Sequence, residues 1–153
     1  MNALTTLFAP DCISLDNPAK SRAEAFAVAG ALFSQHAHLD ASAVVGFLDA
    51  REELGSTALG AGVAIPHGRV KGLKQPIAAF IRLNEPIEFA APDAEPISIL
   101  IVLLVPEKAT QQHLEILSSI AQLLSEPENR KLLNSDSSPE NICHFLQNWG
   151  SHQ

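Results

Sequence analysis

The sequence predicts an α/β fold, a three-layer α/β/α sandwich with a mixed central sheet of about four to five strands. The longest apolar run, Ile97 to Val105, is an almost unbroken series of β-forming residues. Such a run is typical of a central strand that helices cover on both faces. Stretches with helical apolar spacing precede and follow the strand-forming segment. We expect residues 1–153 to form one domain, with a short flexible tail from about residue 149.

The first third of the chain predicts one short strand and two helices. Residues 12–15 are expected to form the strand. A helix is predicted over residues 18–35, because Asn17 is a favourable cap and a proline follows it at the first helical position. Asp40 caps a second predicted helix, which runs to about residue 53. The apolar face of the first helix comprises Ala25, Phe26, Ala29, Leu32 and Phe33.

The middle of the chain predicts strands separated by polar turns. A short apolar strand over residues 63–65 should end at Pro66, which has no N–H to donate to a sheet. Residues 69–76 are expected to form a polar turn, and residues 77–83 a second strand. A proline-rich loop over residues 84–96 leads into the long central strand.

The last third of the chain predicts three helices. Thr110 should cap a long helix that runs to about residue 125. Prolines open two shorter helices, over residues 127–133 and 139–147. The apolar stripe of the long helix comprises Leu114, Ile116, Leu117, Ile120, Ala121 and Leu124.

Composition and charge exclude several classes of function. The net charge is −7 and no basic block is present, so we expect no nucleic-acid partner. No apolar run reaches the roughly 18 residues that a membrane span needs, so we expect no membrane insertion. The N-terminus lacks a basic region followed by a long apolar stretch, which predicts a cytoplasmic protein. Cys12 and Cys143 form no Cys-x-x-Cys pair and are expected to be reduced structural thiols.

The stretch from Arg51 to Gly68 contains most of the residues that suggest chemistry. Gly55 and Gly60 have the spacing of a phosphate-binding loop, but Ala61-Gly62 stand where that loop requires Lys-Ser/Thr. The glycines also follow a helix rather than a strand, which argues against a nucleotide site. Two compatible interpretations remain: the glycines permit close backbone turns, and their N–H groups can receive an anion.

Two histidines are candidates for a reactive site. His67 lies at a predicted strand end, where open α/β sheets place their sites, and an imidazole there can act as a nucleophile, a base or a ligand. His113 lies in the first turn of the long helix, whose positive dipole favours anions and a neutral histidine. If the central strand runs parallel to the strand of His67, both histidines reach the same sheet edge. No third ligand at typical spacing accompanies them, so we expect no metal.

The other candidate residues are an arginine, two leucines and four further histidines. Arg51 can be a solvated cation that interacts with the helix dipole, or a guanidinium clamp for a dianion. Leu54 and Leu59 can meet a docking partner, but we expect both to be buried in the core. The other histidines are expected to be solvated surface residues, namely His36, His38, His144 and His152.

Several short motifs are distributed over most of the chain. The motifs are Arg51, Gly55-Ser56-Thr57, Gly60, Gly62, Ala64-Ile65-Pro66-His67-Gly68, Pro86-Ile87-Glu88-Phe89, Asp93, Pro96-Ile97, Leu104-Val105-Pro106 and His113-Leu114. In these residues the chain resembles the type-2 enzyme IIA domains of the bacterial phosphotransferase system, the fructose, mannitol and nitrogen-regulatory class. It departs at Ala90, where the family usually has a polar residue.

The resemblance implies specific roles for five residues. His67 would carry the phosphoryl group on its tele nitrogen, His113 would stabilise that group, and Arg51 would stabilise its charge. Thr57 and Gly68 would contribute to phosphoryl binding. No metal, nucleotide or other cofactor is implied. The implied donor is a small phosphocarrier protein of the HPr or NPr type.

The resemblance leaves three functional readings. A single domain without a sugar-specific IIB or membrane part is most like the nitrogen-regulatory member, whose phosphorylation state regulates target proteins such as kinases or transporters. The first alternative is a sugar-transport enzyme IIA subunit that passes phosphate to a separate IIB protein. The second is a non-catalytic interaction module, against which the intact Pro-His-Gly motif and the second histidine argue.

Overall fold

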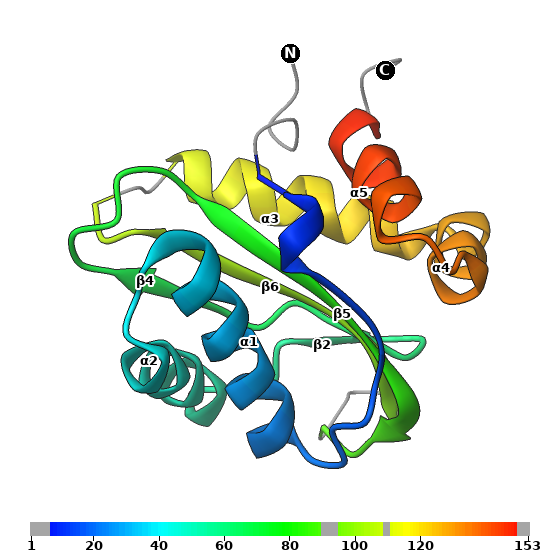
Figure 1. Cartoon of the computed structure of the whole chain (residues 1–153), viewed down its shortest axis with the longest axis horizontal. Helices are drawn as coiled ribbons and strands as arrows, with labels where there is room; N and C mark the ends of the chain where they lie inside the picture. Colours follow the sequence, from blue (N-terminus) through cyan, green and yellow to red (C-terminus); the bar gives the residue numbers. More distant parts are fainter. Residues whose placement is uncertain (1–6, 90–94, 109–110, 150–153) are drawn as a thin grey trace.

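The computed structural model describes residues 7–89, 95–108 and 111–149, and it has the predicted three-layer arrangement (Figure 1). One layer contains α1 (Arg22–Ala37) and α2 (Ala41–Glu53). The other contains α3 (Gln111–Ser125), α4 (Pro127–Ser135) and α5 (Pro139–Asn148). Between them lies one mixed sheet, and a short 3₁₀ helix, η1 (Pro10–Cys12), precedes its first strand. The predicted α/β/α sandwich is therefore confirmed.

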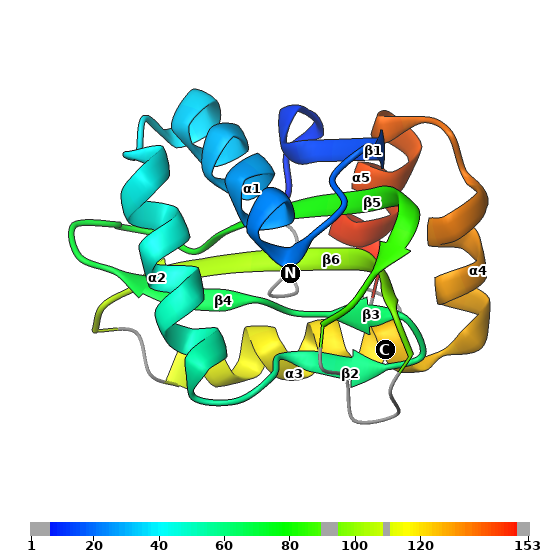
Figure 2. The same cartoon turned by 90° about the horizontal axis from the view of Figure 1, so that it is seen from below.

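The described part of the sheet has six strands, slightly more than expected. They are β1 (Ile13–Asn17), β2 (Ala58–Gly60), β3 (Val63–Ala64), β4 (His67–Val70), β5 (Ile77–Ile87) and β6 (Ile97–Pro106). Their order is β1-β5-β6-β3-β2, and β4 also pairs with β6. The predicted central strand is β6, which is antiparallel to β5 and parallel to both β3 and β4. Figure 2 shows β6 in the middle of the sheet.

Strand β3 ends before Pro66, as predicted, but a further strand, β4, begins directly after the proline and continues the sheet. Ala64 pairs with Leu100 and His67 pairs with Leu103, so the same parallel register continues on both sides of the proline. The Pro66 carbonyl still accepts a hydrogen bond from the Leu103 N–H at 2.9 Å. A proline lacks only the donor, so it can occupy a ladder position that uses its acceptor. The predicted turn consequently begins after Val70.

Two other boundaries also differ from the sequence prediction. Helix α1 begins at Arg22, because Ser21 is the true cap and accepts a hydrogen bond from the Glu24 N–H at 3.1 Å. The Asn17 side chain instead closes a local turn by accepting from the Ala19 N–H. Strand β5 extends to Ile87, into the segment expected to be a loop. The cap of α2 by Asp40 is confirmed, whereas Thr110 lies outside the described residues.

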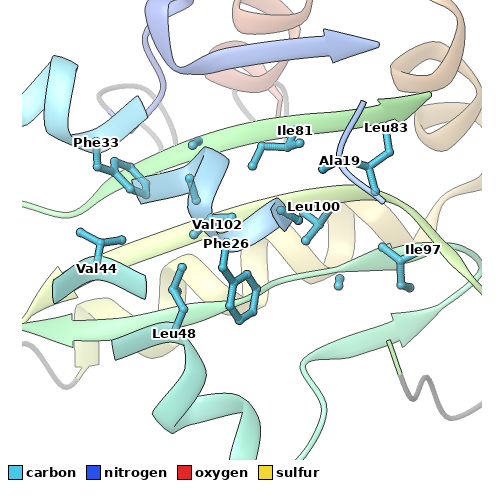
Figure 3. Close-up of a cluster of buried hydrophobic side chains, with 14 of the residues drawn as sticks. Ala19, Phe26, Phe33, Val44, Leu48, Ile81, Leu83, Ile97, Leu100 and Val102 are labelled. Atoms are coloured by element: carbon cyan, nitrogen blue, oxygen red, sulfur yellow. The ribbon is translucent and has the colours of Figure 1, made fainter. Parts of the chain in front are cut away.

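Each face of the sheet has its own hydrophobic cluster. Figure 3 shows Phe26 and Phe33 of α1 and Val44 and Leu48 of α2 on one face of the sheet, where α1 lies over β5 and α2 over β4. On the opposite face, residues of α3, α4 and α5 pack against the alternate side chains of the same strands. Since successive side chains of a strand point to opposite faces, β6 is apolar apart from Ser98 and contributes to both clusters.

Three leucines that were predicted to be buried lie outside these clusters. Leu114, expected in the apolar stripe of α3, is 61% exposed. Leu54 and Leu59, expected in the core, are 85% and 46% exposed. All three predictions of burial are wrong. Both cysteines are free and buried, as expected.

Several surface predictions are tested by the described residues. His38 and His144 are exposed, as expected, whereas His36 is partly exposed and pairs with Asp11. His152 lies outside the described residues. Among the helices described, none is long and apolar enough to cross a bilayer.

Two helical glycines should respond oppositely to substitution by alanine. A Cβ at Gly30 would lie 2.8 Å from the backbone oxygen of Ala41, where α1 and α2 meet, whereas a Cβ at Gly46 would have no atom within 4 Å. Gly30→Ala should therefore lower the free energy of unfolding by about 1–3 kcal/mol. Gly46→Ala should raise it by roughly 1 kcal/mol, since alanine favours the helix. Urea denaturation of both variants tests the contrast, and stabilisation by both would contradict it.

Candidate active site

His67 and His113 reach the same edge of the sheet, as predicted. His67 is the first residue of β4, and His113 lies in the first turn of α3. Because β4 is parallel to β6, and α3 follows β6, the two imidazoles meet with ring centroids 5.5 Å apart and an interplanar angle of 66°. Figure 2 shows α2 crossing β4, and this helix brings Arg51 to the same place.

These side chains line a pocket of about 400 Å³. Four of the five predicted site residues contribute to it, namely Arg51, His67, Gly68 and His113. Arg69 adds a second cation, and Phe47 and Leu54 add apolar surface. The combination of cations, imidazoles and an apolar wall suits an anionic group.

Hydrogen bonds fix the tautomer of His67. Its Nδ1 lies 2.8 Å from the carbonyl oxygen of Ile65, and the Nε–H of Arg51 points to its Nε2 at 3.3 Å. A carbonyl oxygen can only accept a hydrogen bond, and a guanidinium can only donate. The proton of neutral His67 is therefore assigned to Nδ1, and Nε2 carries the lone pair. That lone pair makes Nε2 the nucleophilic atom.

Both histidines are held in the neutral form. Burial lowers the pKa of His67, and the charge of Arg51 acts in the same direction. The bond to Ile65 and the charge of Glu52 oppose this shift without reversing it. Burial also lowers the pKa of His113, and the charge that His67 acquires when protonated and the charge of Arg69 act in the same direction. Since only the neutral imidazole has a lone pair, the site favours nucleophilic chemistry at neutral pH.

His113 has an unsatisfied polar atom. The side chain is 8% exposed, and its buried Nδ1 has no hydrogen-bond partner in the part of the chain that the structure describes. A buried polar group without a partner typically costs about 1–3 kcal/mol. An incoming group with oxygen atoms could supply the partner.

Arg51 is an ordered part of the site rather than a solvated cation. Its Nη1 donates to the carbonyl oxygen of Gly55 at 2.8 Å, while its Nε contacts His67. Two anchors hold the planar guanidinium in one orientation, which favours the clamp interpretation over the dipole interpretation.

Thr57 is outside the pocket lining. Its hydroxyl donates to the carboxylate of Glu52, and its N–H lies 3.2 Å from Glu52 Oε2. Its predicted part in phosphoryl binding therefore remains a prediction, and its visible contact is structural. This contact ties the turn that contains Gly55 to the end of α2, and the Gly55 carbonyl in turn holds Arg51.

Glu52 is the residue that sequence reasoning missed. Its carboxylate is buried, with 6% of the residue exposed. In the sequence it is one of two adjacent glutamates at a helix end, a pattern typical of solvent-exposed charge. No periodicity or motif signals that its partner is Thr57, five residues later.

Gly68 permits the close approach of α2 to β4. A Cβ at this position would lie 3.2 Å from the Cβ of Phe47. Glycine here therefore allows the helix that bears Arg51 to pack against the strand that bears His67. Its predicted contribution to phosphoryl binding stays a prediction.

Comparison with known proteins identifies the family. The family model described as phosphoenolpyruvate-dependent sugar phosphotransferase system, EIIA 2, matches residues 6–149. The chain belongs to this family. Members of the EIIA 2 family function in phosphoryl transfer.

Relatives of the EIIA 2 domain include both regulatory and sugar-specific proteins. A nitrogen regulatory protein of Pseudomonas aeruginosa is 44% identical over 107 residues, which cover 70% of each chain. The crystal structure of the nitrogen regulatory protein IIA-Ntr from Neisseria meningitidis is 46% identical, with a TM-score of 0.86 over 90% of this chain and 94% of that one. A fructose-specific EIIA component of Haloferax volcanii is 32% identical, covering 88% of each chain.

The electrostatics of this EIIA 2 site can be tested by titration. We expect the pKa values of His67 and His113 to lie below about 6.5, the ordinary histidine value. Arg51→Met should raise the pKa of His67, because it removes a nearby positive charge and the donor to Nε2. Arg69→Met is the matched control, which should raise the pKa of His113 instead.

Imidazole proton shifts followed by NMR from pH 4 to pH 8 provide the measurement. A His67 pKa that stays unchanged or falls in Arg51→Met would contradict the assigned role of Arg51.

Proposed function

We propose that this chain is a phosphoryl acceptor and donor of a phosphotransferase system, phosphorylated on His67, whose phosphorylation state regulates other proteins. The observation that carries the proposal is the neutral His67, with its Nε2 lone pair beside Arg51 at a pocket shared with His113. Two nitrogen regulatory relatives, at 44% and 46% identity, resemble the chain more than the fructose-specific component does at 32%, which supports the regulatory branch.

The transfer step balances without any further reactant. The donor is a phosphohistidine on a phosphocarrier protein of the HPr or NPr type. The Nε2 lone pair of His67 attacks phosphorus, and the bond between phosphorus and the donor imidazole breaks, so that this imidazole leaves with the electron pair. The Nδ1 proton stays on His67, bonded to Ile65. Reactant and product are both phosphoimidazoles, so the transfer is readily reversible and depends mainly on positioning and charge stabilisation.

Three side chains are placed to stabilise the transferred group. The Arg51 Nε–H, which points to Nε2 in the free protein, would move to a phosphoryl oxygen when Nε2 forms its new bond. His113 would gain the partner that its buried Nδ1 lacks within the described chain, if that nitrogen donates to another phosphoryl oxygen. Arg69 adds positive charge at the rim of the pocket. No metal ion or nucleotide enters this step.

Exposed apolar side chains around the pocket support docking of a protein partner. Leu54 and Phe47 line the pocket and are 85% and 37% exposed, and Leu114, next to His113 in the chain, is 61% exposed. Large apolar side chains gathered at a surface site are typical of protein interfaces. We infer that the phosphoryl donor and the regulated targets use this face.

The sugar-transport reading is the second candidate. It shares the chemistry at His67 and differs in its recipient, a separate IIB protein. The identity to the fructose-specific component keeps it open. The non-catalytic reading is disfavoured by the oriented His67 and the neighbouring His113.

Phosphorylation should depend on His67 and be accelerated by His113. With phosphoenolpyruvate that carries radioactive phosphorus in its phosphoryl group, and with the general phosphotransferase proteins, His67→Ala should take up no label. His113→Gln should transfer about 10²–10³ times more slowly, the usual loss for one stabilising donor. His144→Ala, an exposed histidine on α5, is the control and should react at the wild-type rate. Label on His67→Ala would contradict the assignment of His67 as the acceptor. Transfer by His113→Gln at the wild-type rate would show that His113 has only a structural role.

Phosphorylation should weaken the binding of regulated targets at the same face. A phosphoryl group adds about 1.5–2 negative charges among apolar side chains, which disfavours a hydrophobic interface. Pull-downs should recover at least one target with the unphosphorylated chain and about tenfold less with the phosphorylated one, equivalent to about 1.4 kcal/mol. Leu54→Asp should cause a similar loss, and Leu132→Asp on α4 should not. Equal recovery in all samples would refute regulation and favour sugar transport.

A further inference from the structure

A group of three metal-ligating side chains lies outside the active-site pocket. Asp11 and Cys12 belong to η1, and His36 belongs to the last turn of α1. Within the ranges that the structure describes, one ligand atom from each of these residues lies within 4.8 Å of the other two. Figure 2 shows η1 near α1 at the edge of the sheet that β1 forms, and none of the three residues lines the active-site pocket.

The distances are close to those of a tetrahedral zinc site. His36 Nδ1 and Asp11 Oδ2 are 2.9 Å apart. Two nitrogen or oxygen ligands, each about 2.0 Å from a tetrahedral Zn²⁺, are separated by about 3.3 Å. A zinc-bound sulfur lies about 2.3 Å from the metal and therefore about 3.5 Å from a nitrogen or oxygen ligand. The Cys12 sulfur lies within 4.8 Å of both other ligand atoms, so the three side chains would adjust around the ion as it binds.

The donor set selects zinc over the hard cations. Magnesium and calcium bind through oxygen, whereas an imidazole nitrogen with a thiolate sulfur is typical of zinc. A thiolate and a carboxylate also balance the two positive charges of the ion. The site would therefore be neutral, which matters because Cys12 is only 1% exposed and a buried net charge is costly. Zinc binds the thiolate form of cysteine, so binding would release the Cys12 proton to solvent.

We propose that Asp11, Cys12 and His36 bind one Zn²⁺, with a water molecule as the fourth ligand. The ion would join η1 to the C-terminal end of α1. Because η1 leads directly into β1, the edge strand that pairs with β5, zinc would also anchor this edge of the sheet. The competing interpretation is a simple ion pair of His36 and Asp11 beside a buried thiol, and surface pairs of that kind contribute little stability.

Cobalt titration of the full chain tests the proposal directly. Co²⁺ replaces Zn²⁺ in such sites and gives a sulfur-to-metal absorption band when a thiolate binds it. The wild-type chain should bind one Co²⁺ with this band, and Zn²⁺ should displace it. Cys12→Ser should lose the band, while Asp11→Asn and His36→Asn should weaken binding by at least about tenfold. His38→Asn, at the αL cap of the same helix, is the matched control and should bind as the wild type does.

Thermal unfolding gives a second readout that does not depend on cobalt. Zinc at about a hundredfold excess over its dissociation constant should raise the Tm of the wild-type chain by about 5–10 °C. The rise should be absent from His36→Asn, whose partly exposed side chain can be replaced without opening the core. It should persist in His67→Asn, which separates this site from the two active-site histidines. Absence of the thiolate band in the wild type, equal affinity in His36→Asn, or loss of binding in His67→Asn would overturn the proposal.

Discussion

The 2.8 Å contact between His67 Nδ1 and the Ile65 carbonyl is the interaction on which the proposed chemistry depends. It places the imidazole proton on Nδ1 and leaves the lone pair on Nε2, next to Arg51. Without that contact the ring could adopt either tautomer, and each would present a different atom to a phosphoryl donor. Burial and Arg51 then lower the pKa of His67, so the lone pair is available at neutral pH. Orientation and ionisation are thus controlled by a few neighbours of one side chain.

The sheet holds the backbone that makes this contact. Its central strand and the helix beside it could be predicted from the sequence, because local patterns mark both. The apolar run that forms β6 is long enough to predict a central strand, and Asp40 marks the start of α2. The passage of the ladder through Pro66 was not predictable, because the partner strand that uses its carbonyl is distant in sequence. The start of α1 was missed since Asn17 and Ser21 are both good caps, and tertiary packing decides between them.

The candidate site was predictable where its signal is local. His67 follows a recognisable strand and motif, and Arg51 precedes it at a spacing that the motif fixes. The Glu52–Thr57 contact was not predictable, because nothing in the sequence indicates that this carboxylate turns inward. The exposure of Leu54 was also missed, since apolar residues are buried by default and exposure at an interface is the exception. The exposure of Leu54 is also the feature that supports a protein interface at this face.

The most direct test of the account is to determine which imidazole nitrogen of His67 carries the phosphoryl group. The chain can be labelled with ¹⁵N in its histidine rings, incubated with a phosphorylated carrier protein of the proposed HPr or NPr type and examined by ¹⁵N and ³¹P NMR. The tautomer assigned here predicts phosphorus bonded to Nε2, with the proton retained on Nδ1 and bonded to Ile65. Phosphorus bonded to Nδ1 would contradict it, because that atom would first have to release both its proton and the Ile65 carbonyl.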